Sequence, residues 1–207
     1  MPAGFSDDDA RAAFRAAIES IERASCAEVV VAVRRHSASW HHAHLLAGVA
    51  AAIAAHAYML FAAHPFSTPA LFWGPIVAGV LVGVASTLVL PLERWATPRS
   101  RRRDAVRRAA RATFVERGIR RTRDATGILV YISVVERMAE LIADDGILAA
   151  VSAEDWAAAC AAVDAAVADG AVATARALER LAPILAHALP APHDDVNELP
   201  DDMDIGP

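Results

Sequence analysis

Asp144 and Asp145 are the residues of this sequence whose type and spacing best suit chemistry. They are adjacent, and they fall between a predicted strand and a predicted helix. Two carboxylates together with loop carbonyls could hold a hard divalent cation such as Ca²⁺ or Mg²⁺. The ligand count is short, because Glu136 is too distant along the predicted hairpin. A solvated turn in which one Asp caps local amides is therefore the alternative.

Motifs for nucleophilic catalysis are absent from the sequence. It contains no G-x-S-x-G elbow, no C-x5-R and no P-loop. The two cysteines, Cys26 and Cys160, have no metal-ligand spacing and fit a reducing compartment. We therefore predict no catalytic residue, and a metal-dependent phosphatase using the two aspartates is only an alternative function.

A dense arginine cluster follows the apolar part of the chain. At the edge of a bilayer such a cluster attracts anionic lipid by about 1 kcal/mol per charge. Nucleic acid is a less suitable partner, because no aromatic residues are interleaved with the arginines. The residues predicted to contact lipid headgroups are Arg99, Arg101, Arg102, Arg103, Arg107 and Arg108.

Histidines lie in and before the apolar part of the chain. His56 falls near the middle of a predicted membrane span, where an ionisable residue suggests either a neutral, locally bonded side chain or a proton or substrate role. A cluster upstream would need three or four converging ligands to hold a metal. The alternative is interfacial histidines at a span boundary, and the residues concerned are His36, His41, His42 and His44.

The apolar part of the chain predicts a membrane hairpin. From His36 to Leu92 there are 57 residues without a formal charge, and hydrophobic residues make up 56% of the whole chain. Two spans of 23 residues fit, over 42–64 and 69–91, and each is long enough for a bilayer core of about 30 Å. Pro65 and Pro69 break the helix between them.

Small residues recur at four-residue spacing in both spans, a pattern that lets helix backbones approach closely in lipid. This favours packing of the two spans against each other rather than against another chain. The residues are Gly79 and Gly83 in the second span and Ala47, Ala51 and Ala55 in the first.

The distribution of arginine predicts the orientation of the hairpin. Arg34 and Arg35 precede the first span, Arg94 and the cluster follow the second, and the turn between the spans has none. The positive-inside rule then places both termini in the cytoplasm of a bacterium, with the two spans in its inner membrane.

The segments around the hairpin make one split domain, residues 1–35 and 96–190. Their periodicity predicts, in order, a helix at 6–24, a strand at 27–35, a helix at 100–118, strands at 127–133 and 137–144, and helices at 153–169 and 171–189. This order predicts an α/β fold: a small mixed sheet of three or more strands covered by helices, with a two-helix transmembrane hairpin inserted after the first strand.

Apolar stripes on the predicted helices indicate the core. The first helix, capped by Ser6, presents Phe14, Ile18 and Ile21, and the second, ended by Gly118, presents Val106, Ala110 and Phe114. The stripes of the last two helices are Trp156, Cys160, Val163 and Val167, then Leu178, Leu181, Leu185 and Leu189.

The last segment, residues 191–207, is predicted to be a disordered tail. It contains six of the 25 acidic residues, three prolines and no arginine. Its charge suits three situations: a solvated end, an association with the arginine helix, or a basic partner.

Four segments resemble the TPM-domain family, named for thylakoid and nematode founding members. They are "AEVVVAVRR", "ATFVERGIRRTRDATGILVYIS", "RMAELIADDGI" and, near the C-terminus, "VNELPDDM". The resemblance implies a mixed α/β domain, acid phosphatase activity of the kind ascribed to some members, and roles in the assembly or repair of membrane complexes. Longer members often carry a GYG-type loop where this chain has Asp144-Asp145-Gly146.

Together these observations predict an inner-membrane-anchored binding or assembly module for a membrane-protein partner. The lipid bilayer is the second expected partner, and nucleic acid is not expected. The alternatives are the metal-dependent phosphatase and, more weakly, a subunit of a transport complex that uses His56.

Overall fold

The computed structural model describes residues 4–5, 7–38, 41–88, 97–122, 124–191 and 203–206. The chain divides into two compact units. The first, called the domain below, comprises residues 1–38 and 102–207, and the second, called the hairpin, comprises residues 39–101. The domain is therefore discontinuous in sequence.

A four-stranded mixed sheet forms the centre of the domain. Its order is β3 (Met138–Ala143), β2 (Gly127–Ser133), β1 (Glu28–Arg34) and β4 (Asp204–Gly206). β1 is parallel to both β2 and β4, whereas β3 is antiparallel to β2. The predicted α/β fold with a mixed sheet and apolar helices inserted after the first strand is confirmed.

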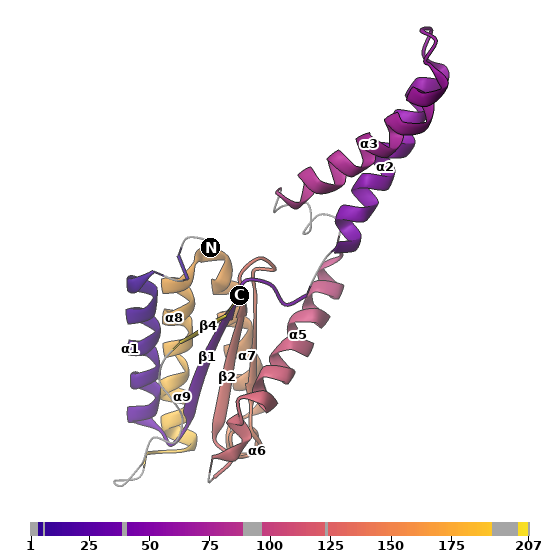
Figure 1. The fold of residues 1–207 in the computed structure, drawn as a ribbon. Coiled ribbons are helices and arrows are strands. Elements are labelled where there is room, and N and C mark those ends of the chain that lie inside the picture. The colour runs from indigo at the N-terminus through magenta and orange to yellow at the C-terminus, as the bar shows by residue number, and fades with distance from the viewer. Residues whose placement is uncertain are drawn as a thin grey trace. The chain divides into compact units, whose positions relative to one another are not determined.

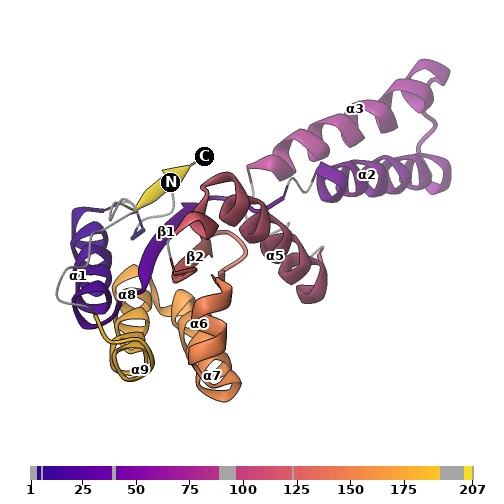
Figure 2. The same cartoon turned by 90° about the horizontal axis from the view of Figure 1, so that it is seen from below.

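Helices cover both faces of the sheet (Figures 1 and 2). Val29, Val31 and Val33 of β1 share one core with α1 (Asp8–Ala24) and the helices α6 to α9, whose bounds are Asp145–Ala150, Ala153–Ala166, Ala171–Glu179 and Leu181–Ala188. The alternate residues, Val30 and Ala32, belong to a second core with α5 (Arg99–Glu116) and the short helix η1 (Ile119–Arg121). Side chains in a strand alternate between faces, which is why one run of valines serves both cores. Another short helix, η2 (Val167–Asp169), follows α7.

The predicted stripes of the first two helices are buried. Phe14, Ile18 and Ile21 of α1 are within the first core, and Asp8 and Asp9 lie in the first turn, where acidic side chains suit the helix dipole. Ser6, the predicted cap, lies outside the described residues.

α5 buries its predicted stripe of Val106, Ala110 and Phe114 in the second core. Gly118 follows the helix with a φ of 67°, a left-handed conformation that glycine adopts without strain, and ends it as predicted.

The final predicted helix, 171–189, is two helices in the structure. α8 ends at Glu179 and α9 begins at Leu181. Pro183 explains the break, because its ring would clash with the carbonyl of Glu179 four residues earlier and it has no amide hydrogen to donate. Leu178, Leu181 and Leu185 are nevertheless all buried on one side, as predicted.

The prediction of a disordered tail over residues 191–207 is wrong for its end. Asp204, Ile205 and Gly206 form β4 and pair with Ala32, Val33 and Arg34 of β1. The acidic composition suggested a segment without a core contact, but Ile205 packs against the first core and Asp204 pairs with arginines. Residues 192–202 and 207 lie outside the described residues.

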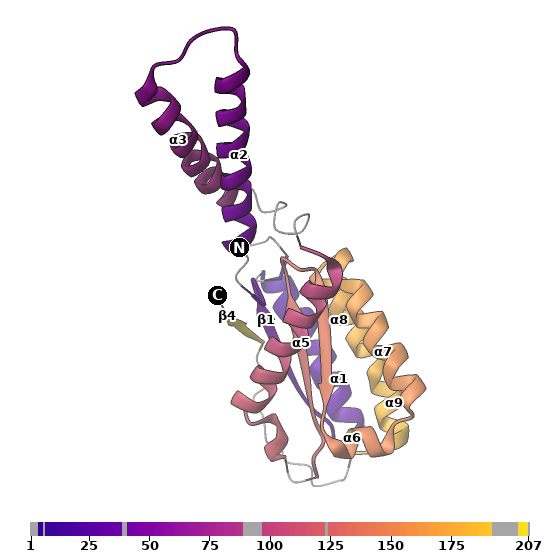
Figure 3. The same cartoon turned by 90° about the vertical axis from the view of Figure 1, so that its right-hand side faces the viewer.

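The hairpin consists of α2 (His41–Phe61) and α3 (Thr68–Thr87), which run side by side (Figure 3). Both helices are long and apolar enough to cross a membrane. The two backbones approach each other closely at Gly48 and Gly79: a Cβ on Gly48 would lie 2.8 Å from the Gly79 carbonyl oxygen. The predicted packing within the hairpin therefore uses the glycines of α3, but Gly48 and Ala52 face them instead of Ala47, Ala51 and Ala55.

Candidate functional site

The structure gives Asp144 a capping role. Its side chain is 5% exposed, and Oδ1 accepts a hydrogen bond from the Asp145 amide at 2.9 Å at the start of α6. Arg120 Nε lies 3.7 Å from the same oxygen. Asp145 is 87% exposed and 4.0 Å from Arg120. This is the capped turn that the sequence offered as the alternative to a cation site.

No group of three or more His, Cys, Asp and Glu side chains that could hold a metal ion occurs among the described residues. Glu136 follows Ser133, which pairs with Met138 at one end of the β2–β3 ladder, whereas Asp144 lies beyond the Ile128–Ala143 pair at the other end. About five residues at about 3.3 Å each separate these pairs. Glu136 therefore lies far from Asp144, as the sequence predicts, and does not supply a third ligand for a cation there.

Half of the predicted lipid-contact arginines on α5 have partners within the domain. Arg103 pairs with Asp164 of α7 at 2.5 Å, Arg107 pairs with Glu140 of β3 at 3.2 Å, and Arg102 donates to the Glu136 carbonyl at 3.5 Å. These contacts fix α5 against β3 and α7. Arg107 is exposed as well as paired, and the other exposed arginines of the cluster are Arg99, Arg101 and Arg108.

Of the histidines, His44 makes a contact between the hairpin helices. Its Nδ1 lies 2.9 Å from Ser86 Oγ, and Ser86 donates its own proton to the Gly83 carbonyl at 2.7 Å. His44 Nδ1 must then be the donor of the pair. His56 is exposed on α2, without a hydrogen-bond partner among the described residues. The side chains of His41 and His42 lie outside them.

A buried polar cluster at the carboxyl ends of β1 and β2 was not predicted. Glu136 is 2% exposed and accepts a hydrogen bond from Ser133 Oγ at 2.5 Å. Ser37 Oγ donates to Ser133 Oγ at 2.7 Å, and the Ser37 amide donates to Glu136 at 3.4 Å. Tyr131 OH lies 3.3 Å from Ser37 Oγ. Burial raises the pKa of Tyr131 above its ordinary value.

This cluster binds the two segments of the domain that lie next to the insertion in the sequence. Ser37 lies on the segment that follows β1, and Arg102 lies on α5, after the hairpin. Both bind Glu136 in the turn between β2 and β3, through its carboxylate and its carbonyl respectively. The arrangement holds the chain in place on both sides of the insertion.

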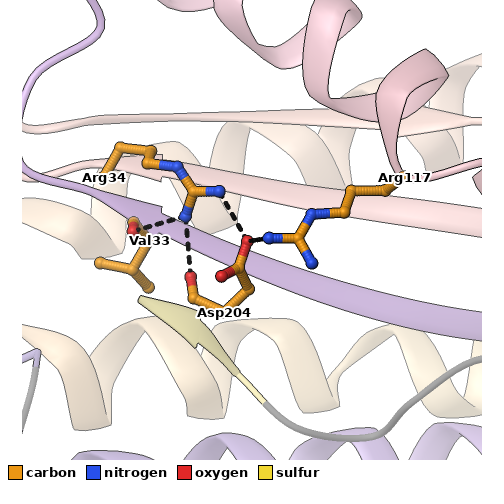
Figure 4. Close-up of polar contacts among 4 residues, drawn as sticks. All are labelled: Val33, Arg34, Arg117 and Asp204. Carbon is orange, nitrogen blue, oxygen red and sulfur yellow. Dashed lines mark hydrogen bonds and ion pairs between the residues drawn. The ribbon is translucent and has the colours of Figure 1, made fainter. Parts of the chain in front are cut away.

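A second polar group lies at the same end of the sheet and joins β4 to β1 (Figure 4). Arg34 Nη2 donates to Asp204 Oδ2 at 2.6 Å, and Arg34 Nη1 donates to the Asp204 and Val33 carbonyls, each at 3.0 Å. Arg117, just after α5, donates to the same carboxylate oxygen. In open α/β sheets, ligands bind at the carboxyl ends of the parallel strands, and both polar groups occupy that position.

The charges around Asp204 favour the ionised form of its side chain. Burial alone would raise the pKa of Asp204, but the hydrogen bond and charge of Arg34, helped by Arg117, outweigh burial and hold the pKa below its usual range. Two guanidinium groups around one carboxylate form charge-assisted hydrogen bonds, which are stronger than neutral ones. The arrangement can therefore recognise an acidic residue in an extended chain.

No protein-family model matches this chain, and no curated protein does. A solved structure that is similar is the NMR structure of the BA42 protein from the psychrophilic bacterium Bizionia argentinensis. The TM-score is 0.60 and the identity 16%, over 100% of this chain and 99% of the other. At this identity the likeness shows the fold alone, and the resemblance to the TPM-domain family stays a prediction.

Sequence analysis missed the two polar groups for identifiable reasons. Local patterning places Arg34 only on the positive side of the predicted span and Asp204 only in the tail. The one available signal was the isolated Ile205 between acidic and glycine residues, an aliphatic position in an otherwise polar segment. Ser37 and Ser133 are 96 positions apart, and only the parallel register of β1 and β2 brings them together.

Proposed function

We propose that this chain is a membrane-anchored binding or assembly module of the bacterial inner membrane. In this proposal α2 and α3 cross the bilayer, and the domain lies in the cytoplasm and binds a membrane-protein partner. The resemblance to the TPM-domain family, whose members have roles in assembling or repairing membrane complexes, points the same way.

The observation that carries the proposal is the exposure of large apolar side chains along both helices of the hairpin. They are exposed on α2 at Leu45, Leu46, Val49, Ile53 and Leu60, and on α3 at Phe72, Trp73, Ile76, Val77, Val80, Leu81, Val82 and Val84. Apolar patches larger than a few hundred Å² are rare on soluble monomers. A lipid bilayer satisfies this surface, and 20 residues of helix match its core of about 30 Å.

Charge supports the proposed orientation. The turn between α2 and α3 has no arginine, whereas Arg34 and Arg35 precede α2 and the exposed Arg99, Arg101 and Arg108 follow α3. In this position these three arginines would contact anionic headgroups from the cytoplasmic side. Arg94 belongs to the same argument but lies outside the described residues.

A binding role suits the polar groups of the domain better than a catalytic one. Ser133 donates to Glu136, Asp144 caps α6, and Arg103 pairs with Asp164. Groups engaged in internal hydrogen bonds stabilise one conformation, which is what a recognition surface requires.

Cysteine labelling tests the membrane topology. In a background with Cys26→Ala and Cys160→Ala, we introduce Ser67→Cys in the turn between α2 and α3. Ala158→Cys, on the exposed side of α7, is the matched control. A membrane-impermeant maleimide should label position 67 in intact spheroplasts and position 158 only after lysis. Labelling of both or neither in intact spheroplasts contradicts the proposed topology.

Affinity purification in mild detergent tests the partner. We expect a membrane protein at a stoichiometric ratio, identified by mass spectrometry, and no phosphatase turnover that a chelator abolishes. Chelator-sensitive turnover that Asp144→Asn removes, in a sample without a partner, would overturn the proposal in favour of the enzyme.

A further inference from the structure

The edge of β1 opposite β2 is built to recognise a particular sequence. β1 has seven residues, and β4 pairs only with the last three, Ala32–Arg34. Near the amino end the Val29 amide donates to Glu22 of α1 at 3.1 Å, which closes that part of the edge. What remains for a partner strand is the carboxyl-terminal half, where Arg34 lies.

Each residue of β4 is matched by a separate feature of this edge. Asp204 receives the guanidinium groups of Arg34 and Arg117 on the face of the sheet that α5 covers. Ile205, on the opposite face, packs against the first core. Gly206 lies against the Arg34 side chain: a Cβ there would be 2.8 Å from its Cζ and Nε. A larger residue would push the guanidinium from its position on Asp204.

We propose that the β1 edge is a recognition site for an extended peptide of acidic–aliphatic–glycine sequence carried by a partner protein, and that β4 is its intramolecular occupant. Main-chain pairing with a sheet edge supplies affinity in such sites, and pockets for alternate side chains supply specificity. Here two arginines form the pocket for the acidic residue, and the domain's own core receives the aliphatic one.

The inference rests on the proposed function, in that it names the surface by which the module would bind its partner. Because β4 is part of the same chain, a partner competes with a local concentration on the order of millimolar for a short connection. A binding partner must therefore make further contacts or meet a domain from which β4 has been released. The edge is accordingly blocked until a competent partner arrives.

The test uses the full-length protein in detergent and a fluorescent peptide with the sequence of residues 200–207, PDDMDIGP. Gly206→Val should release β4 and raise the affinity for the peptide at least roughly tenfold over the unaltered protein, as measured by anisotropy. A peptide with Asp204→Asn should lose at least roughly tenfold, since it forfeits a charge-assisted pair.

Two arginine variants complete the test. Arg34→Gln in the Gly206→Val protein should abolish binding, whereas Arg120→Gln, an exposed arginine that contacts Asp144 and not Asp204, should leave binding unchanged. Equal binding of both peptides, or no gain from Gly206→Val, overturns the proposal.

Should Gly206→Val fail to fold, the unaltered protein provides the measurement. Peptide in excess of the local concentration of β4, on the order of millimolar, should then increase hydrogen exchange at the Ile205 and Gly206 amides, and unchanged exchange overturns the proposal. If peptide binding fails while a membrane partner still co-purifies, this edge is excluded and the assembly function stands. If the peptide binds and no partner co-purifies, the peptide site stands and the assembly function is excluded.

Discussion

The domain and the hairpin bury opposite kinds of residue. In the domain the largest fully buried side chains are apolar, such as Phe14, Ile18 and Leu178. In α3 the buried residues are Pro75, Gly79 and Ser86, while Phe72, Leu81 and their neighbours are exposed. Hydrophobic burial drives association in water, but in lipid it gives helices no reason to associate, so close packing and hydrogen bonds replace it. If the hairpin crosses a membrane as proposed, the two units follow the packing rules of two different solvents.

The most direct test of this comparison is to make the same substitution in both units. Phe14→Ala removes a ring that is 0% exposed and should cost about 3–5 kcal/mol of domain stability. Phe72→Ala, at a ring that is 62% exposed, should cost about 0.5 kcal/mol or less. Thermal unfolding followed by circular dichroism in detergent measures both. Similar losses would mean that the hairpin has a hydrophobic core of its own.

A second substitution adds a side chain at the contact between α2 and α3. Gly48→Val places a branched side chain within van der Waals overlap of the Gly79 carbonyl and should cost about 1–3 kcal/mol of helix pairing. Ala50→Val, on the exposed side of α2, is the matched control and should have no effect. Resistance of the hairpin to separation in SDS, read from gel mobility, gives the result. Equal mobilities would place the helix contact elsewhere.

A third pair of substitutions tests the buried polar group at the start of α6. Asp144→Ala should destabilise the domain by about 1 kcal/mol, because the cap of the helix is lost. Asp145→Ala, at the exposed neighbour, should be close to neutral. Denaturant unfolding measures the difference. A gain in stability from a divalent cation that both variants abolish would instead support the cation hypothesis.

The smallest expected effect is the response of β4 docking to low pH. Because the pKa of Asp204 is lowered in the folded chain, its contribution to β4 docking is complete above the ordinary aspartate pKa of 3.8 and is lost as the pH falls through the lower folded value. The ion pairs are partly exposed, so the contribution is modest. The Gly206 amide in NMR spectra should shift between pH 5 and pH 2, and Asp204→Asn should remove the transition. The described helices of the hairpin carry no carboxylate, and their signals should not share this transition.

Sequence periodicity was sufficient for most of the fold and insufficient for the polar groups. The valine-rich run at 29–33, and the stripe of Phe14, Ile18 and Ile21, predict elements that local patterning decides. The break at Glu179 depends on Pro183 acting four residues back, a local signal that the prediction overlooked. The contact of Asp204 with Arg34 joins residues 170 positions apart, and no local pattern reports it.

The topology also has a consequence for the order of synthesis. α1 packs chiefly against α8 and α9, and β1 pairs with β2, so the first elements to be made have their partners in the second half of the chain. The ribosome adds about 5–20 residues per second, and α9 ends about 150 residues after β1, so this segment waits roughly 8–30 s for its partners. Both α2 and α3 are synthesised within that interval. The nascent domain must therefore keep a valine-rich strand from aggregating until its second half is made, and in the proposed membrane location insertion of the hairpin would fall within the same interval.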